Sequence, residues 1–215
     1  RQRQMCIRDR VRVRMNANSI NYRDLITIEG AGARKLPFPT IPNSDGAGVV
    51  TAIGKGVKLQ EGDRVTSCFF EEWTAGEIGA SIMASALGGA RQGVLAEEVV
   101  LPEHGVIPTP TSLTDEEAAT LPCAALTAWH ALTLPRPVKA GETVLLLGTG
   151  GVSVFAQQFC SIMGAQTIVT SSSDDKLKKM KALGASEIIN YQTNPEWDAI
   201  VLELTGGSGV DRVVE

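Results

Sequence analysis

The chain has 215 residues, which at about 150 residues per domain corresponds to roughly 1.4 domains, and 43% of its residues are hydrophobic against 20% charged. These proportions are typical of a globular protein with a buried core and exclude a disordered or fibrous chain. The formal net charge of −4 argues against nucleic-acid binding, and no apolar run reaches the roughly 18 residues that suggest a membrane span.

The chain starts with an arginine-rich stretch, RQRQMCIRDR, which lacks the apolar centre of a signal peptide. A basic arm could bind phosphate or a membrane surface, but these basic residues do not continue along one face. We therefore interpret residues 1–10 as a non-native or disordered segment and exclude them from the fold.

The four cysteines are far apart, with no C-x-x-C pair and no histidine at ligand spacing. This pattern argues against a disulfide framework or a structural zinc site. Reduced thiols in a cytoplasmic protein are the better interpretation. The cysteines are Cys6, Cys68, Cys123 and Cys160.

Short β-rich runs separated by glycine and proline turns fill the first half of the chain. Such runs predict an antiparallel sheet or barrel, and we assign residues 11–113 to this first domain. The expected strands lie at 11–15, 46–54, 63–69 and 95–102.

From residue 114 onward, continuous apolar runs alternate with helix signals, which predicts parallel strands with covering helices. We assign residues 114–215 to this second, α/β domain. Thr114 with Glu117 forms a capping box for one helix, and Pro122 starts another through Trp129. The expected strands lie at 144–148, 167–171, 187–191 and 211–215, and further helices at 173–184 and from 194 to before 206.

A glycine loop follows the first apolar strand of this domain, with the pattern G-x-G-x-x-S. The motif is weak alone, but here it follows a strand, opens a helix and precedes a second strand. Its backbone N–H groups would bind a dinucleotide pyrophosphate at the helix N-terminus, although an ordinary strand-to-helix turn remains the alternative. The loop consists of Gly148, Thr149, Gly150, Gly151, Val152 and Ser153.

The end of the next strand bears on the choice of cofactor, because NAD enzymes place an acidic residue there. This chain has Thr170-Ser171-Ser172-Ser173 instead, and Asp174 and Asp175 fall in the following helix. The Ser172 hydroxyl and the Lys176 ammonium would suit a 2′-phosphate, which favours NADPH over NADH. Lys176 could equally be a solvated helix residue.

Several segments in the same order resemble the medium-chain dehydrogenase/reductase family, in particular its zinc-free members, the quinone-oxidoreductase-like and zinc-independent alcohol-dehydrogenase-like proteins. The resemblance implies a GroES-like catalytic domain, a Rossmann domain and an active site in the cleft between them. It also implies that residues are missing at both ends, that the remaining strands of both domains lie there, and that the full-length protein is a homodimer. The segments are NSINYRDL (18–25), IPNSDGAGVVTAIGKGV (41–57), EGDRV (61–65), EEAATLPCAALTAWHAL (116–132), the glycine loop, KALGASEIINY (181–191) and GGSGVDRVVE (206–215).

The resemblance also bears on zinc. Zinc-using members have a Cys where this chain has Asn21, a His-Glu pair at Ser44-Asp45, and often a Cys at Cys123. One thiolate cannot form a three-ligand catalytic site, so we expect a protein without zinc or any other metal.

Two residues become catalytic candidates through the resemblance. Asn21 lies in an N-x-x-D motif whose Asn is next to the nicotinamide in zinc-free relatives, and Asp24 of that motif more plausibly braces the fold. Thr127 lies where similar proteins contact the nicotinamide end of the cofactor. The alternatives are an Asn in a turn at a strand end and a buried helical Thr bonded to its own backbone.

Further positions are linked to ligands by the same resemblance. Tyr191 lies where NADP-preferring relatives have a hydroxyl near the 2′-phosphate, although core packing would also explain it. Phe69, Phe70 and Trp73 fall where the family forms part of its substrate cleft, although packed aromatics could simply anchor a loop. His130 has no partner that would make it a base.

We therefore expect an NAD(P)H-dependent oxidoreductase that transfers hydride between the nicotinamide and a small-molecule carbonyl, alcohol, quinone or activated alkene, without a nucleic-acid or membrane partner. The alternative is a protein of the same fold that binds the nucleotide without turnover. We expect the isolated 215-residue chain to be only marginally stable.

Overall fold

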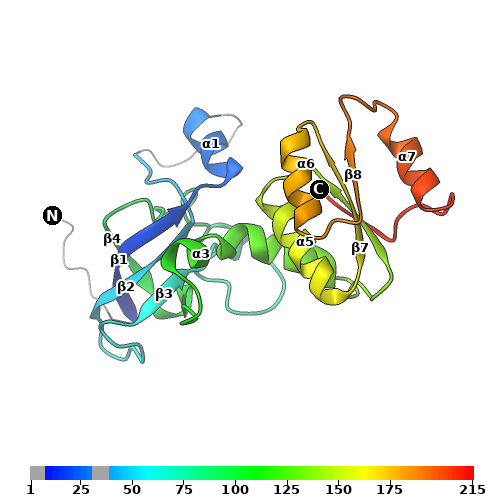
Figure 1. Ribbon diagram of the computed structural model, residues 1–215. Coiled ribbons are helices and arrows are strands. Elements are labelled where there is room, and N and C mark those ends of the chain that lie inside the picture. The colour runs from blue at the N-terminus through cyan, green and yellow to red at the C-terminus, as the bar shows by residue number, and fades with distance from the viewer. Residues whose placement is uncertain (1–7, 31–38) are drawn as a thin grey trace. The chain divides into compact units, whose positions relative to one another are not determined.

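The computed structural model describes residues 8–30 and 39–215. Internal contacts divide the chain into two units, residues 1–123 and 124–215 (Figure 1). The sequence prediction placed the boundary earlier, before residue 114. The segment from 114 to 123 belongs to the first unit because its helix packs on that unit's strands.

The first unit contains a five-stranded antiparallel sheet, as the alternating pattern predicted. Its strands are β1 (Arg10–Ser19), β2 (Asp45–Ile53), β3 (Arg64–Ser67), β4 (Glu98–Pro102) and β5 (Val106–Pro108), in the order β4-β1-β2-β3-β5. Val11 and Val13 of β1 pack with Val50, Val65 and neighbouring apolar residues in one core. Arg12 and Arg14 alternate with these valines and are exposed, which is the period of two expected for a half-buried strand.

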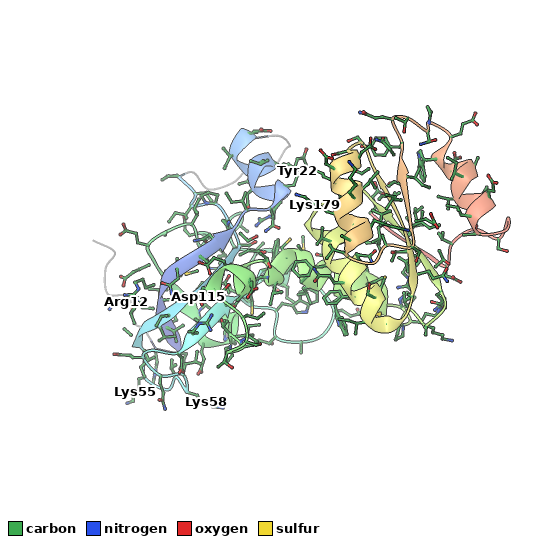
Figure 2. All side chains as sticks on the ribbon, in the orientation of Figure 1. Arg12, Tyr22, Lys55, Lys58, Asp115 and Lys179 are labelled. Atoms are coloured by element: carbon green, nitrogen blue, oxygen red, sulfur yellow. The ribbon has the colours of Figure 1, made fainter. Side chains whose placement is uncertain are left out.

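Three short helices accompany this sheet: α1 (Tyr22–Glu29), α2 (Ala80–Met83) and α3 (Asp115–Ala119). The predicted capping box at Thr114 is present, since Thr114 and Glu117 exchange hydrogen bonds of 3.2 and 2.9 Å. Asp115 (Figure 2) holds α3 on the sheet by accepting hydrogen bonds from Asn16 at 2.7 Å and from Arg64 at 2.6 Å.

The second unit contains a four-stranded parallel sheet in the order β8-β7-β6-β9. The strands are β6 (Thr143–Leu147), β7 (Gln166–Ser171), β8 (Glu187–Asn190) and β9 (Arg212–Val214), which confirms all four predicted strands to within a few residues. Counted along the chain within this unit, the strands lie in the order 3-2-1-4. The first four strands of a dinucleotide-binding fold have the same order.

Helices cover both faces of the parallel sheet (Figure 1). Val144 and Leu146 face a core that includes residues of α5 and α6, whereas Leu145 faces a second core with Val201 of α7. This burial on both faces explains why the strand sequences are continuously apolar. The helices are α4 (Leu126–Thr133), α5 (Gly151–Met163), α6 (Asp174–Ala182) and α7 (Trp197–Leu204).

Three local predictions differ from the structure. No helix was predicted in residues 18–25, and the alternative for Asn21 was a turn at a strand end, but Asn21 is the N-cap of α1, which begins at Tyr22. The single helix expected from Pro122 to Trp129 is a π-helical turn, η2 (Leu121–Ala125), followed by α4. Part of the excluded arginine-rich segment is ordered, because Arg10 opens β1 and accepts a hydrogen bond from Gly54 N–H at 2.9 Å.

Residues 1–7 of that segment, and with them Cys6, lie outside the described residues. Within the described ranges, no helix is long and apolar enough to cross a bilayer.

Candidate functional site

The glycine loop lies between the end of β6 and the start of α5, as its sequence predicted. Gly148 has φ of +85°, a conformation that side chains with a Cβ rarely adopt, and a Cβ built on Gly148 or Gly150 would meet nothing within 4 Å. Gly150 caps α5 without a side-chain hydrogen bond, so no N-cap side chain satisfies the first N–H groups of this 13-residue helix. An anion fits this arrangement well.

Hydroxyl groups join the loop to the neighbouring strand. Thr149 Oγ1 lies 3.2 Å from Ser171 Oγ, and Gly148 N–H donates to Thr170 Oγ1 at 3.4 Å. Ser153, the third position of the motif, is buried and donates to the Leu147 carbonyl at 3.3 Å. Ser153 therefore closes the turn, and Val152 beside it packs against the sheet core.

The two carboxylates beyond β7 are exposed, and each has one polar contact. Asp174 accepts a hydrogen bond from Asn190 Nδ2 at 2.7 Å, and Asp175 pairs with Lys178 at 3.3 Å. Ser172 and Lys176 are exposed, and Lys176 has no ion-pair partner among the described residues. This edge therefore presents hydroxyls and an unpaired ammonium beside two partnered carboxylates.

Tyr191 lies at the same edge, directly after β8. Its N–H donates to the Ser171 carbonyl at 3.1 Å, and its side chain is 42% exposed. The ring is therefore not a core residue, and its backbone is held beside the strand end to which Ser172 is attached.

Asn21 caps α1, and the structure places it near Ser44, Asp45 and Cys123. Its N–H donates to Asp24 Oδ2 at 2.9 Å, and Asp24 is 2% exposed, in line with the bracing role expected for it. The Asn21 Nδ2 atom is buried with no hydrogen-bond partner within 3.5 Å, although the amide is close enough to Asp45 to lower the pKa of its carboxyl. Asn21 thus retains an unused donor.

Asp45 is fully buried and is the centre of this cluster. It accepts hydrogen bonds from Ser44 Oγ at 2.5 Å and from Cys123 N–H at 2.9 Å. Burial raises the pKa of the Asp45 carboxyl, against the lowering effect of the hydrogen bonds from Ser44 and Cys123 N–H and of the nearby Asn21 amide. Three segments distant in sequence therefore meet at one carboxyl group.

The thiol of Cys123 is not activated. Burial, helped by the nearby Asp45 and opposed by Arg23, raises its pKa to about 11. The other thiols of the described residues, Cys68 and Cys160, also have pKa values raised by burial, and none of the three forms a disulfide. At neutral pH these groups are protonated.

The three aromatic residues predicted to line a substrate site form a row. The ring centroids of Phe69 and Phe70 are 4.6 Å apart, those of Phe70 and Trp73 are 5.7 Å apart, and both pairs are edge-to-face. Trp73 is 38% exposed and donates its indole N–H to Gly76 at 3.0 Å. The row is both packed and partly accessible.

Thr127 and His130 are exposed residues of α4. The alternative of a buried Thr127 is therefore wrong, because this face of α4 does not point into the core of its unit. His130 is a surface residue.

The fold and the glycine loop define a protein with a β-rich unit and a dinucleotide-binding unit. Residues 8–111 match the alcohol dehydrogenase GroES-like domain, and residues 151–215 match the zinc-binding dehydrogenase domain. The chain therefore belongs to the medium-chain dehydrogenase/reductase family, with the GroES-like and Rossmann architecture that the resemblance implied.

Known relatives agree with this assignment. The chain is 45% identical over 208 residues to a zinc-type alcohol dehydrogenase-like protein of Schizosaccharomyces pombe, covering 95% of this chain and 60% of that protein. It is 39% identical to an NAD-dependent alcohol dehydrogenase of solved structure, with a TM-score of 0.84 over 96% of this chain and 62% of the other. The Escherichia coli quinone oxidoreductase, solved with NADPH, is 25% identical with a TM-score of 0.79, over 96% of this chain and 57% of the other.

Two features of the site were not predicted from the sequence. The first is the hydrogen bond between Asp45 and Cys123, which are separated by 78 residues. The second is Arg23, whose guanidinium contacts Phe69 and the Leu87 carbonyl. Asn21 with an acidic residue three positions later was a signal for the start of a helix, and would have placed Arg23 in its first turn.

Proposed function

We propose that the protein is an NAD(P)H-dependent oxidoreductase that acts without zinc on a carbonyl, alcohol, quinone or activated alkene. The glycine loop is the observation that carries this proposal. Gly148 and Gly150 leave room above the uncapped N-terminus of α5 that a pyrophosphate would fill. The nicotinamide would supply or accept hydride, and the protein's own residues would bind and orient the reactants.

The chemistry of the available donors supports a reaction without zinc. Asn21 and Ser44 are neutral side chains, and the Cys123 thiol, with a pKa of about 11, is protonated at neutral pH. Both carboxylate oxygens of Asp45 already accept hydrogen bonds. This set of donors favours a reaction without zinc, and no group of three or more His, Cys, Asp or Glu side chains among the described residues could hold a metal ion.

In place of a metal, the Asn21 amide would donate a hydrogen bond to the substrate oxygen. Its Nδ2 atom is buried without a partner, and a buried donor of this kind costs free energy unless a ligand satisfies it. Asp24 fixes the backbone of Asn21 through its N–H, so the amide is held in place before substrate arrives. Phe69, Phe70 and Trp73 would provide an apolar wall, and Thr127 would contact the nicotinamide end of the cofactor.

We further propose that NADPH is preferred. The carboxylates after β7 are engaged with Asn190 and Lys178, while Lys176, Ser172 and Tyr191 are exposed at the same edge. The N–H groups of the glycine loop would bind the pyrophosphate of either cofactor. The difference in affinity between NADPH and NADH would therefore come from the 2′-phosphate alone.

The test uses the complete protein that carries this chain. We expect NADPH to bind more tightly than NADH by calorimetry, and turnover of NADPH with a quinone or an enal, or of NADP⁺ with a secondary alcohol. Asn21→Ala should lower kcat, while Asn16→Ala, which removes an amide bonded to Asp115 instead, should not. Tight nucleotide binding with no turnover on any substrate would exclude the enzyme and leave the alternative, a nucleotide-binding protein.

A further inference from the structure

Arg23 occupies an unusual position for a cation. It lies in the first turn of α1, where the helix dipole disfavours positive charge, and its side chain is only 19% exposed. A largely buried guanidinium needs partners that compensate for the water it loses. Its contacts are therefore informative.

The guanidinium of Arg23 bridges two segments of the first unit. Nη1 donates to the Leu87 carbonyl at 2.7 Å, and the guanidinium carbon lies 4.6 Å from the centroid of the Phe69 ring. A Cβ on Gly89 would lie 2.8 Å from Nη2, so this glycine leaves the space that the guanidinium occupies. The side chain is thus fitted into a specific place.

The two segments that Arg23 bridges are themselves joined. Leu87 N–H donates to the Phe69 carbonyl at 3.0 Å, and Phe70 pairs with Ala86 in a β-bridge. Arg23 therefore stands at one end of a row that continues through Phe69 and Phe70 to Trp73.

Arg23 also faces the carboxylate that holds Asn21. Asp24 Oδ2 accepts from Asn21 N–H at 2.9 Å, and Asp24 Oδ1 lies 3.8 Å from Arg23 Nη1. The guanidinium thus reaches the Asn21 backbone through one carboxylate and the aromatic row through direct stacking.

We propose that Arg23 is a positioning residue, which fixes the Asn21 amide and the aromatic row of Phe69, Phe70 and Trp73 relative to one another. This proposal rests on the proposed function, in which Asn21 binds the substrate oxygen. A planar guanidinium can stack on a ring while its N–H groups donate in the plane, which an ammonium cannot do. Lysine should therefore fail to replace it.

The first experiment measures steady-state kinetics in the complete protein. Arg23→Ala and Arg23→Lys should both lower kcat by roughly 10- to 100-fold, the loss expected when a reacting group is slightly misplaced, with little change in the KM for NADPH. Millimolar guanidinium ion should restore part of the kcat of Arg23→Ala but not that of Asn21→Ala. Arg12→Ala is the control, since Arg12 (Figure 2) makes only exposed contacts, with Thr51 and Glu98.

Gly89→Ala moves the guanidinium without changing Arg23. Gly89 does not have a positive φ, and the atom closest to the new methyl group is the far end of a flexible side chain, so the fold should tolerate the change. We expect Gly89→Ala to lower kcat, as Arg23→Lys does. This variant keeps the test decisive if Arg23→Ala fails to fold.

The last readout does not depend on turnover. With every other tryptophan of the complete protein replaced by Phe, Trp129 and Trp197 among them, Trp73 should emit at longer wavelength and be quenched more readily by acrylamide in Arg23→Ala. Wild-type kcat in both Arg23 variants, full rescue by Lys, or unchanged Trp73 emission would overturn the proposal. If wild-type protein binds NADPH but has no turnover, the proposed function fails, and the Trp73 emission still decides whether Arg23 orders the row.

Discussion

At the scale of single residues, Asp45 shows how a buried charge can organise a site. The carboxyl group has no exposed surface, and its oxygens accept from Ser44 and from Cys123 of the π-helical turn. A π turn lacks the regular helical hydrogen-bond pattern, so an outside acceptor for one of its N–H groups is a stabilising contact. Asp45 supplies that acceptor at the cost of burying an ionisable group.

Replacement of Asp45 should separate the stabilising contact with Cys123 N–H from the cost of burying an ionisable group. Because burial raises the pKa of Asp45 in the folded state, the folded protein binds the proton more tightly than the unfolded chain. This tighter proton binding stabilises the fold fully at pH values below the pKa of Asp45 in the unfolded chain. The stabilisation is lost as pH rises through the pKa of Asp45 in the folded protein. In Asp45→Asn, which keeps an acceptor for Cys123 N–H, that fall in the free energy of unfolding with pH should disappear.

Asp45→Ala is the companion variant, because it leaves Cys123 N–H and Ser44 Oγ without their acceptor. Relative to Asp45→Asn, it should lower the free energy of unfolding by about 1–3 kcal/mol at every pH. Urea unfolding between about pH 4 and pH 7 measures both changes. An unaltered pH slope in Asp45→Asn would show that another group is responsible.

Lys176 decides the choice of cofactor if the proposed NADPH preference is correct. Lys176→Glu places a carboxylate where the 2′-phosphate would bind, so NADPH affinity should fall roughly tenfold while NADH affinity stays unchanged. Lys179→Glu makes the same charge change later in α6, away from the helix N-terminus, and serves as the control. Equal effects of the two variants in calorimetric titrations would argue against a specific contact.

At the scale of elements, alanine variants of Gly148 and Gly150 can test whether the loop between β6 and α5 binds the pyrophosphate. Gly150→Ala should leave stability within about 1 kcal/mol, because its φ of −78° suits any residue, yet weaken NADPH binding by placing a methyl group in the pyrophosphate site. Gly148→Ala should weaken binding and also destabilise the fold, because its φ is +85°.

Gly141 provides a matched control for Gly148. It has the same φ of +85° and the same open surroundings, but it lies before β6 rather than after it. Gly141→Ala should therefore destabilise the fold by a similar amount without affecting nucleotide affinity. A loss of affinity in Gly141→Ala equal to that in Gly148→Ala would mean that backbone strain, not the pyrophosphate site, causes the effect.

The elements differ in how well the sequence predicted them, for physical reasons. The strands of the second unit are continuous apolar runs because both faces are buried, and the glycine loop is recognisable from its position between strand and helix. Helix α1 was missed because it has only eight residues and contains the β-branched run Ile26-Thr27-Ile28, a residue type that favours strands.

The contacts of the candidate site were harder to predict than its residues. The pattern pointed to Asn21, but Asp45 beside it, and the contacts of Arg23 with Phe69 and Leu87, come from segments whose proximity depends on the tertiary fold. Nothing in the local sequence indicates that Arg23 is buried or that Asp45 binds the Cys123 N–H.

At the scale of the whole molecule, the described buried apolar residues fall into clusters that do not cross between the two units. Leu101 of β4 belongs to a cluster of the first unit, and Leu146 of β6 to one of the second. Residues that share one core unfold together, so we expect each unit to unfold in a separate transition.

Calorimetry of matched variants of the complete protein should therefore resolve two transitions. Leu101→Ala and Leu146→Ala each remove a buried leucine, 4% and 0% exposed, and should cost about 2–5 kcal/mol in one transition only. NADPH at about a hundred times its Kd should raise the transition that Leu146→Ala lowers, by about 2.7 kcal/mol, because a ligand stabilises the unit that binds it. A single transition shifted equally by both variants and by NADPH would show instead that the two cores unfold together.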